Sequence, residues 1–426
     1  MIDLIYFIFL AFIIFQGLFT LYLTLYVWED PEMLDKMASP KKFLDPKKSF
    51  TVIIPAKHEQ KVIGQTIRSL SHTNYPKSLV EIIIVCEEND IKTIQAIKKA
   101  VTQFRIENVK IITFIDAPTN KPHALNKGLS IAKNEIISIF DAEDEVSKDI
   151  FNVANTLFLT KKPDIIQAGV QLMNYASKWF SVHNTLEYYF WFKSRMHFHT
   201  KIGVVPLGGN TVFFKTQHLR EIGGWNEACL TEDAEIGIRL SVKGAKIIST
   251  YDPLHITKEE TPGTMSQFIK QRTRWNQGFI QILRKGLWKD YNSFIKRAFC
   301  LYVLSFPIVQ TIVFISTPIS IYFGFFGKLP IWLSLLSFMP LAIILLQYVI
   351  NVIALHEFIK EQKLDNQPLV YILMPFTLIP YQFLLGVAAM RASFRELLGH
   401  TNWEKTNHPG LHRNLYDNLN FNADLA

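Results

Sequence analysis

The chain has 426 residues, of which 49% are apolar and only 19% are charged. This balance excludes an ordinary soluble domain and indicates an integral membrane protein with a large aqueous part. Lysine and arginine outnumber aspartate and glutamate by 45 to 37, which suits anionic lipids and nucleotides, but no basic module typical of nucleic-acid binding stands out. The three cysteines, Cys86, Cys229 and Cys300, show no paired spacing, so we expect free thiols and neither disulfides nor a zinc site.

Residues 1–28 contain a continuously apolar stretch, Leu4–Trp28, that is long enough to cross a bilayer. It lacks a basic leading region and a small-residue cleavage site, so we expect a retained anchor. Only Asp3 is charged before it, whereas lysines are frequent after it, which places the chain from about Glu29 in the cytosol by the positive-inside rule. We therefore expect a multi-pass protein of the inner or plasma membrane, with a linker over residues 29–48 leading into a cytosolic domain.

Residues 49–260 alternate short β-branched runs with segments of helical periodicity. Near-continuous apolar strands with helical crossovers predict an α/β domain whose predominantly parallel sheet is covered on both faces. Ligands of such folds gather at the carboxyl ends of the strands. We expect strands at Phe50–Pro55, Val80–Cys86, Val109–Ile115 and Ile136–Phe140, and helices at Val62–Ser71, Ile91–Phe104 and Ala124–Lys133.

Acidic side chains follow three of the predicted strands, and Glu59 comes after the first of them. Asp141, Glu143 and Asp144 come after the fourth strand, and Glu87 ends the second. Carboxylate oxygens beside a phosphate site suit Mg²⁺ or Mn²⁺, which bridges them to a diphosphate; an acidic turn that caps the next helix is the alternative. Glu87 is placed to accept a hydrogen bond from a nucleobase imide, although for this residue alone a plain surface glutamate is the better explanation.

The segment Trp179–Phe198 is unusually aromatic. It suits either a buried helix of the domain or an interfacial helix at the lipid head groups. After it, the run Pro-Leu-Gly-Gly-Asn predicts a tight turn in which the backbone of Gly208, Gly209 and Asn210 can closely approach a ligand.

Glu232 and Asp233 stand at the head of a helical pattern. We expect Asp233 to be ionised, because the dipole at a helix start lowers the pKa of a carboxyl group. An ionised carboxylate can accept a proton from an attacking sugar hydroxyl. If attack comes opposite a departing diphosphate, the anomeric centre inverts and no covalent intermediate is needed. The alternative is an acid that only complements the helix dipole.

Residues 261–297 contain a basic amphipathic helix, Thr264–Lys285, ahead of further apolar segments. Gln271, Arg274 and Trp275 share one face of it, because they are spaced by three and four residues. A guanidinium suits a phosphate, and an indole can pack flat against a sugar ring. We therefore expect these three side chains to contact a substrate.

Residues 298–390 form a second apolar region, and residues 391–426 are polar again. Two stretches are long enough to span a bilayer, and a third is interrupted by prolines. The candidates are Ala298–Phe326, Leu329–Leu355 and the proline-interrupted Leu369–Met390.

Taken in order, these motifs resemble the processive, membrane-embedded family-2 glycosyltransferases, such as cellulose synthase, hyaluronan synthase and poly-N-acetylglucosamine synthase. The resemblance runs along nearly the whole chain through "FTVIIPAKHE", "CEEND", "KPHALNKGL", "FDAED", "PLGGN", "TED", "QRTRW" and "WEKTNH". It implies a Rossmann-like GT-A domain and transmembrane and interfacial helices. The ordered set is highly specific, although "FDAED" or "TED" alone would not be.

The resemblance also implies residue roles. Asp233 matches the catalytic base, Asp141 the first metal-binding aspartate, and either Glu143 or Asp144 the second. The nucleotide-sugar site implied by the matching motifs comprises Glu59, Glu87, Lys121, Asp141, Gln271, Arg274, Lys405, Thr406 and His408, and the acceptor site comprises Glu232, Trp275, Gly208, Gly209 and Asn210. Glu87 replaces the usual aspartate, and the usual Asp-x-Asp becomes Asp-Ala-Glu-Asp, so the sequence leaves the second metal ligand open.

The carboxyl-terminal tail poses a topological conflict. "WEKTNH" resembles the gating loop of cellulose synthases, in which Lys405, Thr406 and His408 would reach the diphosphate from the cytosol. Three full crossings after a cytosolic domain would instead place this tail outside. We therefore expect Leu369–Met390 to be re-entrant or to lie along the interface. The alternative is an exported tail and a chance match.

The resemblance favours a polysaccharide synthase that adds a hexose or N-acetylhexosamine from a nucleotide sugar, with UDP as the expected nucleotide, to a growing β-linked glycan coupled to export. Accessory export subunits are conceivable partners beside the glycan and the lipid bilayer. One alternative is transfer of a single sugar to a lipid carrier or glycolipid. An alternative of another class is a membrane transporter or scaffold that only senses a nucleotide sugar.

Overall fold

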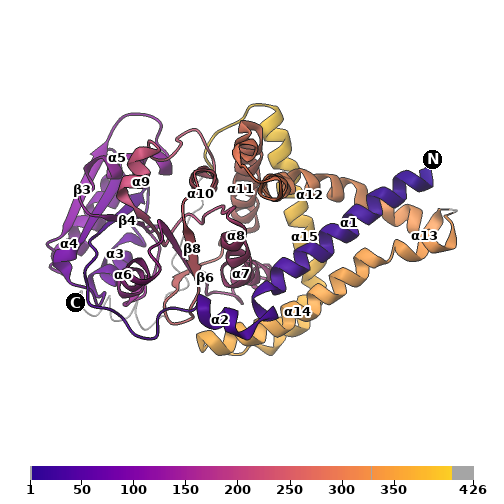
Figure 1. Cartoon of the computed structure of the whole chain (residues 1–426), viewed down its shortest axis with the longest axis horizontal. Coiled ribbons are helices and arrows are strands. Elements are labelled where there is room, and N and C mark those ends of the chain that lie inside the picture. Colours follow the sequence, from indigo (N-terminus) through magenta and orange to yellow (C-terminus); the bar gives the residue numbers. More distant parts are fainter. Residues whose placement is uncertain (1, 328, 405–426) are drawn as a thin grey trace.

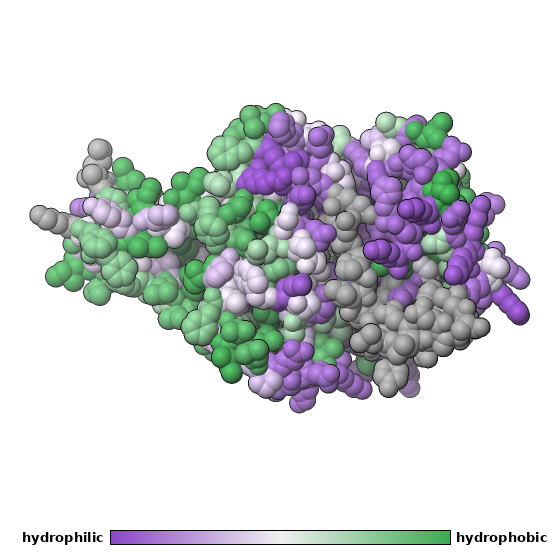
Figure 2. All heavy atoms as spheres, turned by 180° about the vertical axis from the view of Figure 1, so that it is seen from behind, coloured by the Kyte–Doolittle hydropathy of each residue, from purple (hydrophilic) through white to green (hydrophobic). Residues whose placement is uncertain are grey.

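The computed structural model describes residues 2–327 and 329–404. In Figure 1 an α/β domain occupies one end of the molecule and a bundle of long helices extends from the other. Figure 2 shows that hydrophobic side chains predominate on the surface of the helical bundle, whereas hydrophilic ones predominate on the α/β domain. Such a division is expected when one part of a chain lies in lipid and the other in water.

A seven-stranded sheet forms the centre of the α/β domain, in the order β3-β2-β1-β4-β7-β5-β8. Its paired strands are parallel except that β7 is antiparallel to both β4 and β5. β1 pairs with both β2 and β4, so the carboxyl ends of these three strands lie at one edge. The strands are β1 (Phe50–Ala56), β2 (Val80–Glu87), β3 (Val109–Phe114), β4 (Ile136–Ile139), β5 (Ile165–Ala168), β7 (Val212–Lys215) and β8 (Ile247–Thr250).

Helices cover both faces of this sheet, as the near-continuous apolar strands predict. Successive side chains of a strand point to opposite faces, so Val52 packs with the helices α3, α4 and α6, while Ile53 packs with α5, α9 and α10. The helices are α3 (Ile63–Ser71), α4 (Ile91–Gln103), α5 (Lys121–Ile131), α6 (Ile150–Thr160), α9 (Thr216–Glu221) and α10 (Glu232–Val242).

The predicted strands and helices agree with the structure closely, apart from the start of α5. The sequence places that start at Ala124, whereas the helix begins at Lys121. The side chain of Asn120 accepts a hydrogen bond from the backbone N–H of His123 at 3.1 Å and so caps the helix earlier. Lys121 is therefore the first residue of α5 and lies at the end of this helix that faces the sheet edge.

The aromatic segment is buried, so the first of the two alternatives for it holds. It comprises α7 (Ser181–Phe190), a π-helical turn (Trp191–Arg195) and α8 (Met196–Ile202). Tyr189 and Met196 have no exposed surface. The segment packs against α1, α14 and α15, and it also contacts β6 and β8. It therefore lies between the α/β domain and the helical bundle.

Shorter elements complete the domain. A separate two-stranded parallel sheet carries Glu259 at its end and lies beside the loop that follows β4, since Glu145 bridges to Lys258. It consists of β6 (Val170–Leu172) and β9 (Thr257–Glu259), and 3₁₀ turns occur at Tyr26–Glu29, Lys77–Leu79 and Leu287–Asp290. The expected linker over residues 29–48 is partly wrong, because α2 (Pro31–Met37) forms within it; Asp30 caps this helix and Pro31 suits its first turn.

Among the described residues, four segments are long and apolar enough to cross a membrane. They correspond to the three predicted spans and the proline-containing candidate. The helices in this part of the chain are α1 (Ile2–Leu25), α11 (Met265–Lys285), α12 (Phe294–Phe326), α13 (Ile331–Leu336), α14 (Met339–Gln362) and α15 (Pro368–Leu397).

The proline-containing segment is a continuous helix, and its placement as re-entrant or along the interface stays a prediction. Pro375 and Pro380 lie inside α15 without breaking it, because neighbouring helices compensate for the lost backbone hydrogen bonds. Figure 1 shows α15 beside the amphipathic α11 and across the direction of α1 and α14. This course carries the chain back to the α/β domain at the end of α15.

Candidate active site

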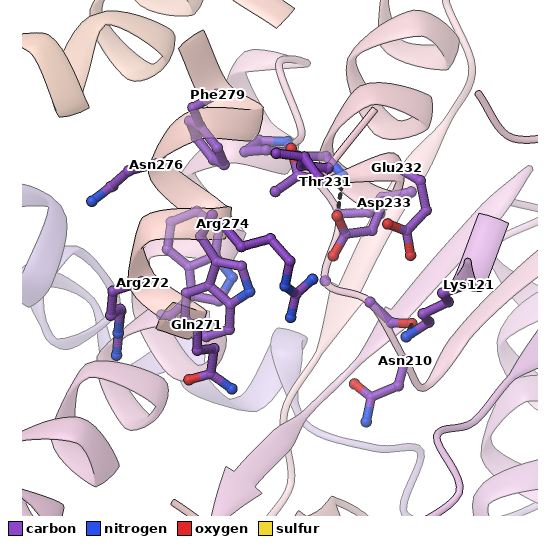
Figure 3. A pocket seen from close by; sticks show the side chains of 18 of the residues that line it. Lys121, Asn210, Thr231, Glu232, Asp233, Gln271, Arg272, Arg274, Asn276 and Phe279 are labelled. Atoms are coloured by element: carbon purple, nitrogen blue, oxygen red, sulfur yellow. Dashed lines mark hydrogen bonds between the residues drawn. The ribbon is translucent and has the colours of Figure 1, made fainter. Parts of the chain in front are cut away.

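One cavity of about 1260 Å³ lies between the carboxyl edge of the sheet, α10 and α11. Its walls bring together most of the residues singled out in the sequence, although these are as far apart in the chain as Glu59 and Trp403. Figure 3 shows Lys121, Asn210, Glu232 and Asp233 on one side and the side chains of α11 on the other. A cavity of this size accommodates a nucleotide and a sugar together.

The first part of the wall follows β1 and β2. Glu87 ends β2 and forms an ion pair of 2.5 Å with Lys57, which follows β1. Glu59 is buried in the same loop, and its backbone N–H donates to Thr93. Glu59 and Glu87 both line the cavity, as expected for residues at strand ends.

Lys121 lies at the centre of the charged wall. Its ammonium group contacts the carboxylate of Asp141 and donates to the carbonyl of Gly209 at 3.0 Å. Burial disfavours the ammonium charge, but the carboxylates of Asp141 and Glu232 outweigh burial and raise the pKa of Lys121. A permanently charged lysine thus faces the site where the sequence predicts a diphosphate.

The structure separates the acids after β4. Asp141 and Glu143 line the cavity, whereas Asp144 does not. Asp144 is fully buried and accepts hydrogen bonds from the backbone N–H of Asp141 at 2.8 Å and from the amide of Asn210 at 2.9 Å. The metal role expected for Asp144 and the acceptor role expected for Asn210 stay predictions: Asp144 does not line the cavity, whereas Asn210 lines it and binds carboxylates through its amide.

Glu259 is a cavity residue that sequence reasoning missed. It ends β9, contacts the amide of Asn210 and lines the cavity beside the acids after β4. Burial, followed by the charges of Asp141 and Glu143, raises the pKa of Glu259 to about 8. No motif links "TKEE" to "FDAED", so only the pairing of β6 with β9 could have revealed this residue.

Asp233 lies in the first turn of α10, where its carboxylate accepts from the backbone N–H of Ala234 at 2.8 Å. The expected direction of its pKa is wrong. Burial raises the pKa of Asp233, and Lys121 and the helix start only partly offset this. Burial and the charge of Asp233 also raise the pKa of Glu232 to about 7. A base with a raised pKa accepts a proton more readily near neutral pH.

The glycine turn brings backbone close to these acids. A Cβ atom on Gly209 would lie 3.1 Å from a carboxylate oxygen of Asp233 and 3.3 Å from the ammonium of Lys121. A Cβ atom on Gly208 would lie 3.1 Å from the ring of Phe192. Neither glycine has a positive φ, so the turn needs glycine for space alone.

The opposite wall is formed by α11, which begins after the capping side chain of Thr264 and ends at Gly286 with φ 78°. Gln271, Arg274 and Trp275 all line the cavity, as their spacing predicts. In Figure 3 the guanidinium of Arg274 points from α11 toward the carboxylates of Glu232 and Asp233. Within residues 2–327 and 329–404, the Nε atom of Arg274 and the amide oxygen of Gln271 are buried without a hydrogen-bond partner, so both are available to a ligand.

The start of the tail reaches the same cavity. Asn402 and Trp403 line it, and the ring centre of Trp403 lies 4.6 Å from the guanidinium of Arg274. Lys405, Thr406 and His408, which the sequence assigns to the nucleotide sugar, lie outside the described residues.

A cleft of this build, at the carboxyl edge of a mostly parallel sheet with an antiparallel strand, is typical of GT-A enzymes that take a sugar from a nucleotide diphosphate. The chain belongs to glycosyltransferase like family 2, whose model matches residues 46–278. Its α/β domain is therefore a glycosyltransferase domain.

Relatives with different acceptors resemble the chain about equally. Beta-monoglucosyldiacylglycerol synthase of Trichormus variabilis is 27% identical over 235 residues, which cover 54% of this chain and 49% of that protein. Poly-beta-1,6-N-acetyl-D-glucosamine synthase of Staphylococcus aureus is 25% identical over 277 residues, which cover 64% of each. The chain thus spans about half to two thirds of the length of these relatives.

A solved structure shares the fold over nearly the whole chain. The mannosyltransferase PcManGT from Pyrobaculum calidifontis, in complex with GDP-Man and Mn²⁺, aligns with a TM-score of 0.60 at 15% identity. The alignment covers 94% of this chain and 99% of that protein, so the helical bundle as well as the GT-A domain belongs to the shared fold.

Proposed function

We propose that this enzyme transfers a hexose or N-acetylhexosamine from a nucleotide sugar, with inversion, to an acceptor hydroxyl beside the membrane. The observation that carries the proposal is the single cavity in which Asp233 faces Arg274 across the site and Trp275 lines the same wall as Arg274. The acceptor is either a growing β-linked polysaccharide or a lipid-linked sugar. The GT-A domain would lie in the cytosol and the bundle in the inner or plasma membrane.

Four residues of the cavity have different roles in the proposed reaction. Asp233 accepts the proton of the acceptor hydroxyl while the hydroxyl oxygen bonds to the anomeric carbon. The bond from that carbon to the diphosphate breaks on the opposite side, so the configuration inverts. Arg274 and Lys121 stabilise the charge on the departing nucleoside diphosphate. Trp275 provides an apolar face for the acceptor ring.

The acids after β4 fit a Mg²⁺ or Mn²⁺ ion held jointly with the diphosphate. The described residues contain no cluster of three or more ligating side chains, which agrees with a cation that takes one or two carboxylates and completes its shell with phosphates and water. Asp141 and Glu143 would hold it, because both line the cavity. The raised pKa of Glu259 supports this, since burial and the charges of Asp141 and Glu143 raise it and so mark a concentration of negative charge. A bound cation would neutralise charge on the leaving diphosphate. The related fold of PcManGT was solved with GDP-Man and Mn²⁺, which also supports the proposal.

The test is transfer by the purified protein in lipid nanodiscs. Labelled UDP- and GDP-sugars would be supplied with Mg²⁺ or Mn²⁺, and the anomeric configuration of the product would be determined by NMR. We expect one nucleotide class to support transfer and the product to be the β-anomer of an α-linked donor. Retention of configuration would contradict the assignment of Asp233 as base.

A further inference from the structure

The cavity does not stop at Trp275 but continues between the membrane helices. Residues of α1, α12, α14 and α15 line this inner part. Several of them are uncharged and polar, namely Thr20, Gln310, Gln347, Asn351 and Gln382. Amide side chains are costly in lipid and therefore mark a binding path when they face a cavity. Uncharged amides suit the hydroxyl groups of a sugar.

The inner part ends within the bundle. From α1 only Thr20 and Leu23 line it, and from α12 no residue beyond Gln310 does so. The distal ends of the helices pack on one another instead, with Tyr6 against Phe323 at a ring distance of 6.0 Å and Phe7 against Trp332 at 5.7 Å. The cavity thus holds the end of an acceptor but provides no continuous path through the described helices.

A half-buried arginine lies where the cavity meets the membrane helices. Arg195 lines the cavity and donates to the hydroxyl of Thr24 at 2.7 Å, and its Nε atom is buried without a partner among the residues that the structure describes. Within the described residues no carboxylate lies at ion-pair distance from it. Glu187, whose charge also acts on Arg195, is paired with Arg272. The guanidinium stays charged, and within the described part of the chain no ion pair balances its charge.

The local backbone explains how Arg195 comes to face the cavity. It ends the π-helical turn Trp191–Arg195, and such turns commonly occur at functional sites. Within the same turn Lys193 points the other way and pairs with Glu357 at 2.8 Å and Glu361 at 2.6 Å on α14. Lys193 thus forms ion pairs with two glutamates, whereas Arg195 forms none with the described residues.

The position of Arg195 matches the depth of a lipid head group. Thr24 lies in the last turn of α1, and Tyr302, which also lines the cavity, lies near the start of α12. Outside this point, Phe294 and Ile295 are exposed apolar residues on α12, 83% and 68% accessible. Lys201 lies over the ring of Tyr26 on the outer surface. Cations above exposed apolar side chains are typical of a membrane boundary.

We propose that the acceptor is a sugar or short glycan joined through phosphate to an apolar lipid, and that Arg195 binds this phosphate. The lipid chain lies in the bilayer beside α1 and α12, and the sugar extends past the amides toward Trp275. A base is needed only for a nucleophile that carries a proton, so a sugar hydroxyl attacks the anomeric carbon and not a phosphate oxygen. Asp233 takes the proton, and the nucleoside diphosphate departs. This inference rests on the proposed function and names its acceptor.

A panel of acceptors separates this inference from the proposed function. The purified protein in phosphatidylcholine nanodiscs would receive its nucleotide sugar and either polyprenyl-diphosphate-linked N-acetylglucosamine, glucosyl-diacylglycerol or a soluble β-linked oligosaccharide. We expect transfer to the phosphate-linked acceptor at least about tenfold more efficiently than to the others. Preference for the oligosaccharide, or growth of long polymer without lipid phosphate, would overturn the inference and leave glycosyl transfer intact. Failure to use any donor would overturn the proposed function instead.

Variants of Arg195 test the site itself. Arg195→Gln should raise the KM of the phosphate-linked acceptor by about tenfold or more, Arg195→Lys should restore part of the loss, and neither should change nucleotide affinity. Binding of polyprenyl phosphate alone, followed by tryptophan fluorescence, should weaken in parallel. Arg68→Gln, on the far surface of the GT-A domain, is the control. Equal binding of polyprenyl phosphate by Arg195→Gln and the parent protein would refute the proposed site.

Discussion

The guanidinium of Arg274 lies 4.6 Å from the centre of the Trp403 ring. Arg274 belongs to α11 and Trp403 to the segment after α15, so this contact joins the wall of the active site to the start of the tail. Two hydrogen bonds of 2.7 and 2.6 Å from Arg391 to Glu404 hold the segment in place. The tail therefore begins beside the catalytic cavity, which supports its predicted placement on the cytosolic side.

Ending the chain after Asn402 should cripple transfer, because it removes Trp403 from Arg274 and with it the predicted gating residues. Trp403→Ala should give a smaller loss of about two- to thirtyfold, since a cation–π contact contributes on the order of 0.5–2 kcal/mol. Steady-state transfer rates would measure both. Leu398→Ala, an exposed residue just after α15, is the control. Protease cleavage of the tail from the outside of intact cells would contradict its cytosolic placement.

Asp233→Asn should lower the rate of transfer by about a hundredfold or more, because an amide cannot accept the acceptor proton. The substitution preserves shape, so nucleotide-sugar affinity measured by calorimetry should remain within about threefold of the parent value. Asp149→Asn, at the start of α6 and outside the cavity, provides the matched control. Full activity of Asp233→Asn would remove the basis for an inverting mechanism at this residue.

Asp141→Asn should weaken the dependence of donor binding on divalent cations. The parent protein should bind its nucleotide sugar much more tightly with Mn²⁺ than after chelation, whereas the variant should show little difference between these two conditions. Asp144→Asn serves as a contrast: it should reduce stability, because Asp144 accepts hydrogen bonds from Asn210 and the Asp141 backbone, but leave the cation dependence in place. The reverse pattern would show that the metal ligands were assigned to the wrong acid.

Gly209→Ala should impair catalysis without unfolding the protein. Its Cβ atom would lie 3.1 Å from Asp233 and 3.3 Å from Lys121, so both side chains must shift. We expect kcat to fall about tenfold or more while the melting temperature changes little. Gly263→Ala is the control, because the same atom there would meet Gln267 at an ordinary 3.5 Å. Similar kinetics for both variants would contradict the close packing around Asp233.

Glu259 makes stability depend on pH in metal-free buffer. Its pKa is about 8 in the folded protein and about 4.3 in an unfolded chain, so the folded state alone holds a proton between these values. The free energy of unfolding therefore falls as the pH rises through this window, by an amount on the order of a few kcal/mol. Glu259→Gln should raise the melting temperature at pH 9 and leave it nearly unchanged at pH 4. Glu221→Gln, an exposed control, should do neither.

Several elements could be predicted because their signals are local. The apolar runs of β1, β2 and β4 determine the order of strands and helices, and their ends place Glu87 and Asp141 at one edge of the sheet. The spacing of Arg274 and Trp275 places both on one face of α11. These features depend on helical and strand periodicity, which is a property of neighbouring residues.

Other predictions failed because they depend on distant residues. The helix dipole suggested a low pKa for Asp233, but the burial that raises it comes from elements far along the chain. The sequence left Glu143 and Asp144 as alternatives, and only the structure distinguishes them, because the amide of Asn210 binds Asp144 while Glu143 lines the cavity. Glu259 joined the site only through the pairing of β6 with β9.

The sequence by itself determined that this chain is a membrane-associated glycosyltransferase with a GT-A domain, because motifs and hydropathy are properties of short, continuous segments. Only the tertiary structure decided how α15 turns back beside α11, that the cavity enters the bundle and ends there, and that Arg195 faces it without an anion. Those properties arise from packing between helices whose contacts are non-local, and no periodicity in the chain encodes the space left between them.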